Sequence, residues 1–315
     1  MGKRNDVYTE NRNSLRKRIK EDFVRNRSLY LLVLPVVAFY LIFNYGPLYG
    51  ALIAFKDYKP QLGMWGSKWV GFKHFEAFFT NPSFFKLLKN TLRISLTTLV
   101  FGFPAPIILA LLLNELKSQK FAKIAQNITY MPHFVSLVVI CGMLKAFCAK
   151  NGIINYVLAI FGHEPANLLV MPEYFTTIYV ASGIWQEIGW GSIIYLAALT
   201  SVDAQLYDSA VIDGAGKWRQ LISITIPAIV PTIITMLILR IGSIISVGYE
   251  KLLLLYNDAT LGVADVINTY TYRKGLIDLD WSFSAAVGLF NSAVNLIFLV
   301  SANTISKKLS DTALW

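Results

Sequence analysis

Long runs of apolar residues alternate with short polar segments along the chain after residue 27. A helix rises 1.5 Å per residue, so about 20 apolar residues cross the ~30 Å hydrocarbon core of a bilayer. Six uncharged or nearly uncharged runs reach that length, two of them interrupted only by Glu187 and Arg240, and each predicts a spanning helix: Ser28 to Phe55, Ile94 to Asn114, Ile124 to Leu144, Tyr174 to Val202, Leu221 to Tyr249, and Trp281 to Ser306. The expected fold is an all-α membrane protein with both termini on one side.

The basic residues indicate which side that is. Nine Lys/Arg side chains lie in the first 27 residues, against four acidic ones. Cytoplasmic segments are enriched in Lys and Arg, and charges near the first span usually dominate. We therefore predict a basic cytoplasmic tail over residues 1–27, a six-span domain over residues 28–315, and cytoplasmic termini in a plasma or inner membrane. Over the whole chain the bias is small, with 16 Lys/Arg inside and 12 outside.

Composition agrees with a membrane protein and disfavours other classes. Of the 315 residues, 55% are hydrophobic and 15% charged, more apolar surface than one soluble core buries. The net charge of +10 would suit nucleic acid, but no basic recognition helix or aromatic RNA-binding signature accompanies it. The two cysteines, Cys141 and Cys148, stand seven apart in one apolar run, so we expect them on one helix face and predict neither a disulfide nor a metal site.

Prolines recur inside the expected spans. A proline removes a backbone donor and clashes with the preceding turn, but buried membrane helices tolerate the break where neighbours satisfy the freed carbonyls. Kinked helices around a pathway and ordinary enrichment of proline in membrane helices both remain open as interpretations. The positions are Pro35, Pro47, Pro104, Pro106, Pro132, Pro227 and Pro231.

The segment between the fourth and fifth spans, residues 203–222, has the most informative polar pattern. Asp203 can cap a short helix on which Leu206, Ala210 and Val211 share a face, and Gly214 can end it. The sequence Gly-Ala-Gly-Lys that follows lacks the leading glycine and the Ser/Thr of a phosphate-binding loop, because Val211 and Trp218 occupy those positions. We predict a docking helix on the inner membrane surface, and no nucleotide site.

The spacing in this loop resembles a signature of the permease subunits of binding-protein-dependent ABC importers. That signature reads Glu-Ala-Ala, three residues, Gly, nine residues, Ile, one residue, Leu, Pro. The matching positions here are Asp208, Ser209, Ala210, Gly214, Ile224, Ile226 and Pro227. Asp208, Ser209 and Ile226 depart from it, each by a residue of similar size or charge. The resemblance implies that the 206–227 loop couples to a separate ATPase through Asp208, Ser209, Ala210, Asp213, Gly214, Ala215, Ile224 and Pro227.

Other stretches are similar to the branch of these permeases, related to the maltose type, that imports oligosaccharides or polysaccharide-derived sugars. They are MPHFVS from Met131, GIWQEIGWGSIIYLAAL from Gly183, the outer stretch from Tyr249 to Gly275, and AVGLFNSAVN from Ala286. The resemblance implies a non-catalytic subunit without a cofactor of its own. Its partners would be a second homologous permease, two copies of a cytosolic ATPase that binds ATP and Mg, and an extracytoplasmic solute-binding protein.

Aromatic and polar residues within two spans are candidates for a sugar pathway, because aromatic faces stack on sugar rings and polar groups replace hydroxyl hydration. They are Trp185, Gln186, Glu187, Trp190, Asn291 and Asn295. Packing or interfacial anchoring would explain the tryptophans equally well. Glu187 and Arg240 are the two charges within spans, where each costs about 3 kcal/mol, so we expect them to meet or to line a cavity. We expect His133, next to Pro132, to bond a freed backbone carbonyl.

Two other classes remain as alternatives. An ion-coupled secondary transporter could use Glu187 as a proton carrier, but no internal repeat supports it. A membrane enzyme acting on lipid-linked sugar would need clustered acids or metal ligands. Its candidates are outer aspartates at irregular spacing, namely Asp258, Asp265, Asp278 and Asp280.

Overall fold

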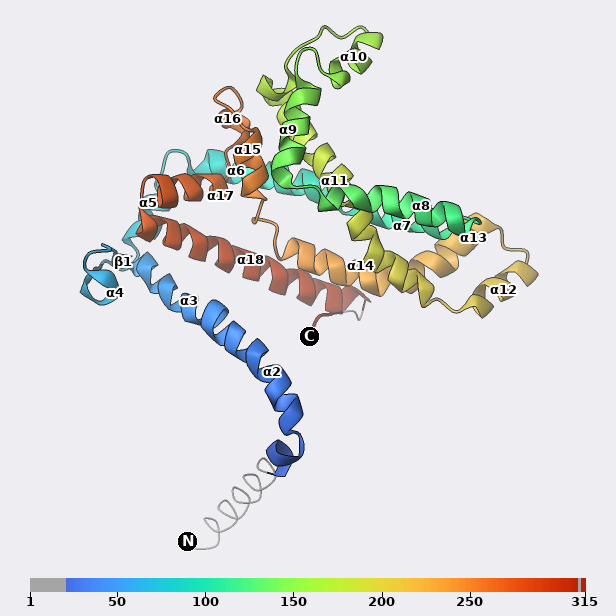
Figure 1. Ribbon diagram of the computed structural model, residues 1–315, viewed down its shortest axis with the longest axis horizontal. Helices are drawn as coiled ribbons and strands as arrows, with labels where there is room; N and C mark the ends of the chain where they lie inside the picture. Colours follow the sequence, from blue (N-terminus) through green and yellow to red (C-terminus); the bar gives the residue numbers. More distant parts are fainter. Residues whose placement is uncertain (1–20, 311–312) are drawn as a thin grey trace, which may run out of the picture.

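The computed structural model describes residues 21–310 and 313–315, so most of the expected basic tail lies outside the described residues. Helices make up most of that part, together with one two-stranded hairpin (Figure 1). Five helical segments within it are long and apolar enough to cross a membrane: Arg27–Phe55, Phe84–Asn114, Leu137–Ile160, Lys217–Ile241 and Trp281–Lys308. The chain is therefore an all-α membrane protein.

The first apolar run forms the segment that extends away from the other helices in Figure 1. It consists of α2 (Arg27–Tyr40), a π turn η1 (Leu41–Tyr45), α3 (Gly46–Leu48) and a 3-10 helix η2 (Tyr49–Phe55). None of the residues of α2 is buried, and η2 packs against the last helix, α18 (Trp281–Ser310). The predicted bounds of the first span and the predicted start of the last are thus confirmed to within one residue.

The second run extends further toward the N-terminus than the apolar pattern indicates. Its helix begins at Phe84 and comprises α6 (Phe84–Thr97), the π turn η3 (Thr98–Gly102) and α7 (Pro104–Asn114). The first turns of α6 are amphipathic, with Phe84, Leu87 and Thr91 buried on one side. Because Lys86, Lys89 and Arg93 interrupt the sequence, a rule that requires a charge-free run begins the span too late.

Three of the span prolines lie shortly after a π turn. The turns η1, η3 and η6 (Leu221–Thr225) end two residues before Pro47, Pro104 and Pro227, respectively. A proline cannot donate to the carbonyl four residues earlier and its ring crowds that carbonyl, and a π turn widens the helix at that point. These helices therefore continue through the prolines instead of ending there.

The expectation that Ile124 to Leu144 forms one helix is wrong. The structure has α8 (Gln119–Tyr130), the 3-10 turn η4 (Met131–Phe134) and then α9 (Leu137–Cys148). Pro132 lies in η4, and both Val135 and Ser136 have extended ψ angles, of 133° and 137°. Helix α9 then turns away and leads to α10 (Ile153–Ile160) and η5 (Leu168–Val170), which project from the bundle (Figure 1).

Helix α11 (Pro172–Thr200) is the central helix and packs against α7, α8 and α14 (Ile226–Ile241). Its glycines allow the closest approaches, since a Cβ on Gly189 would lie 2.1 Å from the Thr129 carbonyl oxygen of α8. Although α11 has 29 residues, it is not among the five segments that meet the apolar criterion, because polar residues such as Gln186 and Glu187 interrupt it.

After α11 the chain forms α12 (Ala204–Ile212) and α13 (Lys217–Gln220) and then enters η6 and α14. The fifth helix ends at Ile241, eight residues before the predicted end. Gly242 lies against Leu299, where a Cβ would be 2.6 Å from the leucine Cδ1, and the Asn295 carboxamide oxygen accepts a hydrogen bond from the Ile245 N–H at 3.2 Å. The Asn295 side chain of α18 thus provides the acceptor for the Ile245 N–H after the helix has ended.

The two remaining segments that are predicted to lie outside contain regular structure. The first has an antiparallel pair, β1 (Lys56–Asp57) with β2 (Lys68–Trp69), flanked by α4 (Gly63–Gly66) and α5 (Lys73–Phe79). The other contains α15 (Tyr249–Leu255), α16 (Leu261–Ala264), α17 (Ile267–Tyr272) and the π turn η7 (Arg273–Ile277). Cys141 and Cys148 are both buried and unlinked in the cluster around Phe175 and Leu252, as small apolar side chains would be.

Candidate functional site

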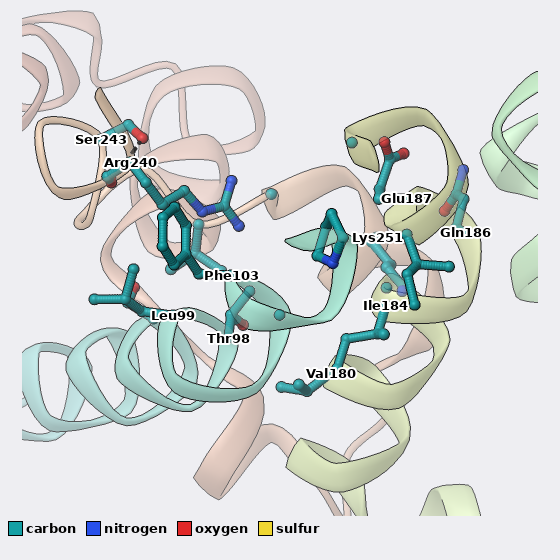
Figure 2. Close-up of a pocket in the computed structure, with 18 of the residues that line it drawn as sticks. Thr98, Leu99, Phe103, Val180, Ile184, Gln186, Glu187, Arg240, Ser243 and Lys251 are labelled. Carbon is teal, nitrogen blue, oxygen red and sulfur yellow. Dashed lines mark hydrogen bonds between the residues drawn. The ribbon is translucent and has the colours of Figure 1, made fainter. Parts of the chain in front are cut away.

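A cavity of about 690 Å³ lies beside α11. Its walls come from η3 and α7 on one side, and from the end of α14, the following turn and α15 on the other (Figure 2). Apolar residues such as Phe103, Ile184 and Val247 alternate in the walls with polar ones such as Thr98 and Ser243. A cavity of this size and mixed lining can hold a small polar molecule with apolar faces.

The structure brings together some of the predicted pathway residues and not others. Gln186, Glu187 and Trp190 line the cavity from α11, and Arg240 lines it from α14. Trp185 is exposed outside the lining. Asn291 donates to the Asn268 side chain at 3.0 Å, and Asn295 holds the turn after α14 through Ile245 and through Ser246 Oγ at 2.9 Å. Those two asparagines organise the cavity wall from behind.

Glu187 has a bonding partner that the sequence did not suggest. The His133 Nδ1 atom lies 3.0 Å from Glu187 Oε2, and the imidazole stacks on the Trp190 ring with centroids 4.5 Å apart and planes inclined by 2°. The expectation that His133 bonds a backbone carbonyl is therefore wrong. His133 lies in η4, where the helix is broken, and from there its ring contacts Glu187 and Trp190 of α11.

Glu187 and Arg240 do not form an ion pair with each other, although both line the cavity from different helices (Figure 2). Among the described residues, the Arg240 side chain has no hydrogen bond or ion pair. Its guanidinium extends from its own helix toward the side of the cavity formed by α11 (Figure 2). The cavity thus contains a cationic fork that is open to a ligand.

Lys251 is a second cation of the lining, and sequence reasoning missed it. It is only 7% exposed, its Nζ donates to the Tyr179 carbonyl oxygen at 3.1 Å, and it lies over the Tyr179 ring at 5.0 Å from the centroid. Burial lowers the pKa of Lys251 to about 8. A signal was present in the sequence, since this lysine directly precedes four leucines and so belongs to a buried helix face.

The loop between α11 and α14 has a quite different character. Asp203 caps α12 by accepting from the Gln205 N–H at 2.9 Å, and Gly214 ends the turn with φ +74°, as the sequence predicts. None of the residues of α12 is buried. Its apolar side chains are highly exposed, with Ile212 at 86%, and Trp218 of α13 is 77% exposed. Such a patch marks an interaction surface or contact with the membrane.

A few polar contacts hold this loop to the helices. The Tyr207 hydroxyl and Thr225 Oγ1 lie 2.9 Å apart, and the buried Gln220 side chain donates to the Ala215 carbonyl oxygen at 2.8 Å. Lys217 Nζ reaches Glu115 Oε2, at the end of α7, over 3.1 Å. Asp208, Ser209 and Asp213 are exposed, Ala210 and Ala215 are half-buried, and Ile224 and Pro227 lie at the entry to α14.

Three of the four predicted outer aspartates have side-chain partners among the described residues, whereas Asp258 has none. Both carboxylate oxygens of Asp265 accept from the Arg273 guanidinium, at 2.6 and 2.9 Å, and this hydrogen bonding raises the pKa of Arg273. Asp278 pairs with Lys274 at 2.7 Å, and Asp280 caps α18 through the Phe283 N–H. In the described part of the chain, no three His, Cys, Asp or Glu side chains gather as metal ligands.

Comparisons with known proteins agree with these features. Residues 102–311 match the family described as "Binding-protein-dependent transport system inner membrane component". The chain is 45% identical to the protein LplB of Bacillus subtilis (strain 168), over 92% of each chain. It is 44% identical to the polygalacturonan/rhamnogalacturonan transport system permease protein YteP of the same organism, over 95% of this chain and 94% of YteP.

A solved structure extends the similarity to three dimensions. It is a bacterial alginate ABC transporter in complex with an alginate pentasaccharide-bound periplasmic protein, and the matching chain is 41% identical, with a TM-score of 0.86 over 94% of this chain and 100% of that one. The family match covers well over half of the sequence, and the similarities extend over most of it. This chain belongs to the family of inner membrane components of binding-protein-dependent transport systems.

Proposed function

We propose that this protein is the permease subunit of an ATP-driven importer that takes up oligosaccharides delivered by an extracytoplasmic solute-binding protein. The observation that carries this proposal is the similarity, over more than nine tenths of the chain, to YteP and to the alginate importer. The cavity beside α11 supports it, because Trp190 offers an aromatic face and Gln186 and Glu187 offer hydrogen-bonding groups.

The proposed topology has six spans, with α11 as the span that the apolar criterion omits. Its polar residues face the cavity and the η4 break, so they do not need to contact lipid. The ion pair between Lys217 and Glu115 supports the sidedness, since it brings together two loops that are both predicted to be cytoplasmic. Likewise, the Tyr58 N–H donates to Ser282 Oγ, which joins two predicted outer segments.

In this proposal α12 is the coupling helix that docks on a cytosolic ATPase. The exposed apolar side chains Leu206, Val211 and Ile212 would enter a cleft of the ATPase, and Asp208 and Asp213 would form contacts at its rim. Two ATPase copies bind and hydrolyse ATP with Mg, while this chain carries no covalent chemistry. A second, homologous permease completes the pathway, and the exposed surface of α2 is available to it or to lipid.

The mechanism is alternating access. ATP binding closes the ATPase dimer and moves the two coupling helices together, the permease pair opens outward to receive the sugar, and hydrolysis returns it to the inward-facing state. The local bonds of the loop, from Tyr207 to Thr225 and from Gln220 to Ala215, would transmit the movement of α12 directly into η6 and α14. The cavity would then change its access as these helices move.

The variant Gly214→Arg tests the docking role. At φ +74° any side chain strains the backbone, and an arginine there would also obstruct the partner's surface. We expect normal membrane insertion, loss of copurification with the ATPase, and loss of uptake.

Gly162→Arg is the matched control, because Gly162 has φ +83°, open space around it, and a predicted outer position. It should retain the ATPase. Normal uptake by Gly214→Arg would overturn the docking role, and uptake that needs an ion gradient but no ATPase would favour a secondary transporter instead.

A further inference from the structure

Within the part of the chain that the structure describes, two cations of the cavity have no acidic partner. The ion pairs of the described residues are Lys217–Glu115, Arg273–Asp265 and Lys274–Asp278, and Glu187 contacts the His133 imidazole, so neither Arg240 nor Lys251 takes part in such a pair. Both line the same cavity, from α14 and α15 respectively. Arg240 lies within a span, where a positive charge costs about 3 kcal/mol and usually marks a substrate or ion pathway.

Arg240 is the better placed of the two to contact a ligand. Its residue is exposed although it belongs to a helix of the bundle, and its guanidinium extends into the cavity (Figure 2). The neighbouring Ser243 hydroxyl donates to the Arg240 main-chain carbonyl at 3.1 Å and has no hydrogen bond with the guanidinium. A planar guanidinium with free donors matches a carboxylate, which it binds through two parallel hydrogen bonds.

Lys251 reinforces the positive potential from within the wall. Its amine is held by the Tyr179 carbonyl oxygen, and no carboxylate lies within ion-pair distance of it among the described residues. With a pKa of about 8, it is mostly protonated at neutral pH. Charges act more strongly in such a partly desolvated site than they do in water.

The acidic residues of the lining suit a different part of the same ligand. Glu187 is already bound to His133, and Glu250 is exposed at the start of α15. Carboxylates accept hydrogen bonds from sugar hydroxyls, and the Trp190 face can stack on a sugar ring. A neutral saccharide would use these groups but leave Arg240 unpaired, whereas a uronic acid unit offers hydroxyls, a ring face and a carboxylate.

We propose that Arg240 forms a carboxylate subsite, supported by Lys251, and that the imported oligosaccharides are acidic, with uronate units. This inference deepens the proposed function and rests on it. It assigns part of the substrate selection to the membrane subunit, in addition to the selection made by the solute-binding protein. It also identifies Arg240 as the residue that distinguishes acidic from neutral sugars.

The test uses the complete transporter, with both permeases and the ATPase, purified and reconstituted. The probes are trigalacturonate and trimannuronate, each compared with its carboxyl-reduced, neutral trisaccharide. Binding to the complex without the solute-binding protein isolates the contribution of the permease, and uptake with that protein present completes the experiment. We expect the wild type to bind at least one acidic probe about tenfold more tightly than its neutral form.

Arg240→Gln should lower binding and uptake of the acidic probe about tenfold and leave those of the neutral one unchanged, and Arg240→Lys should give an intermediate loss because it retains charge without the fork. Arg93→Gln is the control, since Arg93 contacts Thr176 outside the cavity and should keep the wild-type preference. Copurification with the ATPase checks that each variant folds.

Equal binding of acidic and neutral probes by the wild type would overturn the carboxylate subsite but would not contradict the proposed importer function. The same holds if Arg240→Gln changes the binding of both probes equally. Failure of the wild-type complex to bind or transport any saccharide, with its ATPase active, would instead overturn the proposed function itself.

Discussion

The α12–α13 loop and the cavity beside α11 are built in opposite ways. The loop is exposed along its length and is held by a few polar bonds, such as Lys217 to Glu115. The cavity lies among closely packed helices, and α11, which lines it, approaches α8 so closely that a Cβ on Gly189 would lie 2.1 Å from the Thr129 carbonyl oxygen. A change in the loop should therefore weaken binding of a partner and spare this chain's stability. A change in the helices around the cavity should reduce both transport and stability.

The largest expected effect is from Gly189→Val. The added side chain would overlap the α8 backbone, since even a Cβ would lie 2.1 Å from the Thr129 carbonyl oxygen. We expect a loss of about 3 kcal/mol or more in stability, measured as a lower melting temperature and a lower yield of folded protein. In the loop, Gly216→Ala meets nothing within 4 Å and should change stability by less than about 0.5 kcal/mol. Similar losses of stability from Gly189→Val and Gly216→Ala would contradict this difference between the packed helices and the loop.

Asp208→Asn tests whether the loop acts through a partner and not through this chain's stability. The Asp208 side chain is exposed and forms no hydrogen bond with another described residue, so its charge is available to the ATPase. We expect uptake to fall about tenfold, equivalent to about 1.4 kcal/mol, with an unchanged melting temperature. Asp208→Glu, which restores the signature residue, should retain uptake. A lower melting temperature for the Asn variant would place the role of Asp208 inside this chain.

His133→Ala should affect both stability and transport. The change removes the bond to Glu187 and the stacking on Trp190. Because the pair is partly exposed, we expect a loss of about 1 kcal/mol in stability together with reduced uptake. Glu187→Gln keeps an acceptor for the imidazole and should cost less stability. Thermal unfolding and uptake of the wild type and the two variants check this. Unchanged uptake by His133→Ala would show that the His133 stack on Trp190 is not part of the sugar pathway.

The effect confined to the narrowest range of conditions is a pH dependence at Lys251. Its pKa is about 8 in the folded chain and 10.5 in the unfolded reference, so between these values the unfolded chain binds the proton and the folded chain does not. Stability from this group therefore rises with pH across that window and is lost as pH falls. Lys251→Met should be more stable than wild type near pH 7, and the difference in melting temperature should shrink toward pH 10. A constant difference would contradict the shift.

The fold was predictable wherever a single segment carried the information. The apolar runs located the first and last spans because a bilayer imposes length and polarity on each helix separately. The third span was misplaced since the run from Ile124 to Leu144 contains no Asp, Glu, Lys or Arg, and a criterion based on charge does not register the break that Pro132 and the extended Val135 introduce. Polar residues such as Glu187 were identifiable as unusual, but their partners were not.

By itself, the sequence determined the membrane class, the family resemblance and the conformation of the loop, since the Asp203 cap and the left-handed Gly214 depend on contacts within a few residues. The tertiary structure alone decided that Glu187 pairs with His133, 54 residues away, and that Arg240 and Lys251 face one cavity. The physical reason is that local bonds follow from chain geometry, whereas these juxtapositions depend on how α8, α11, α14 and α15 pack, which no single segment specifies.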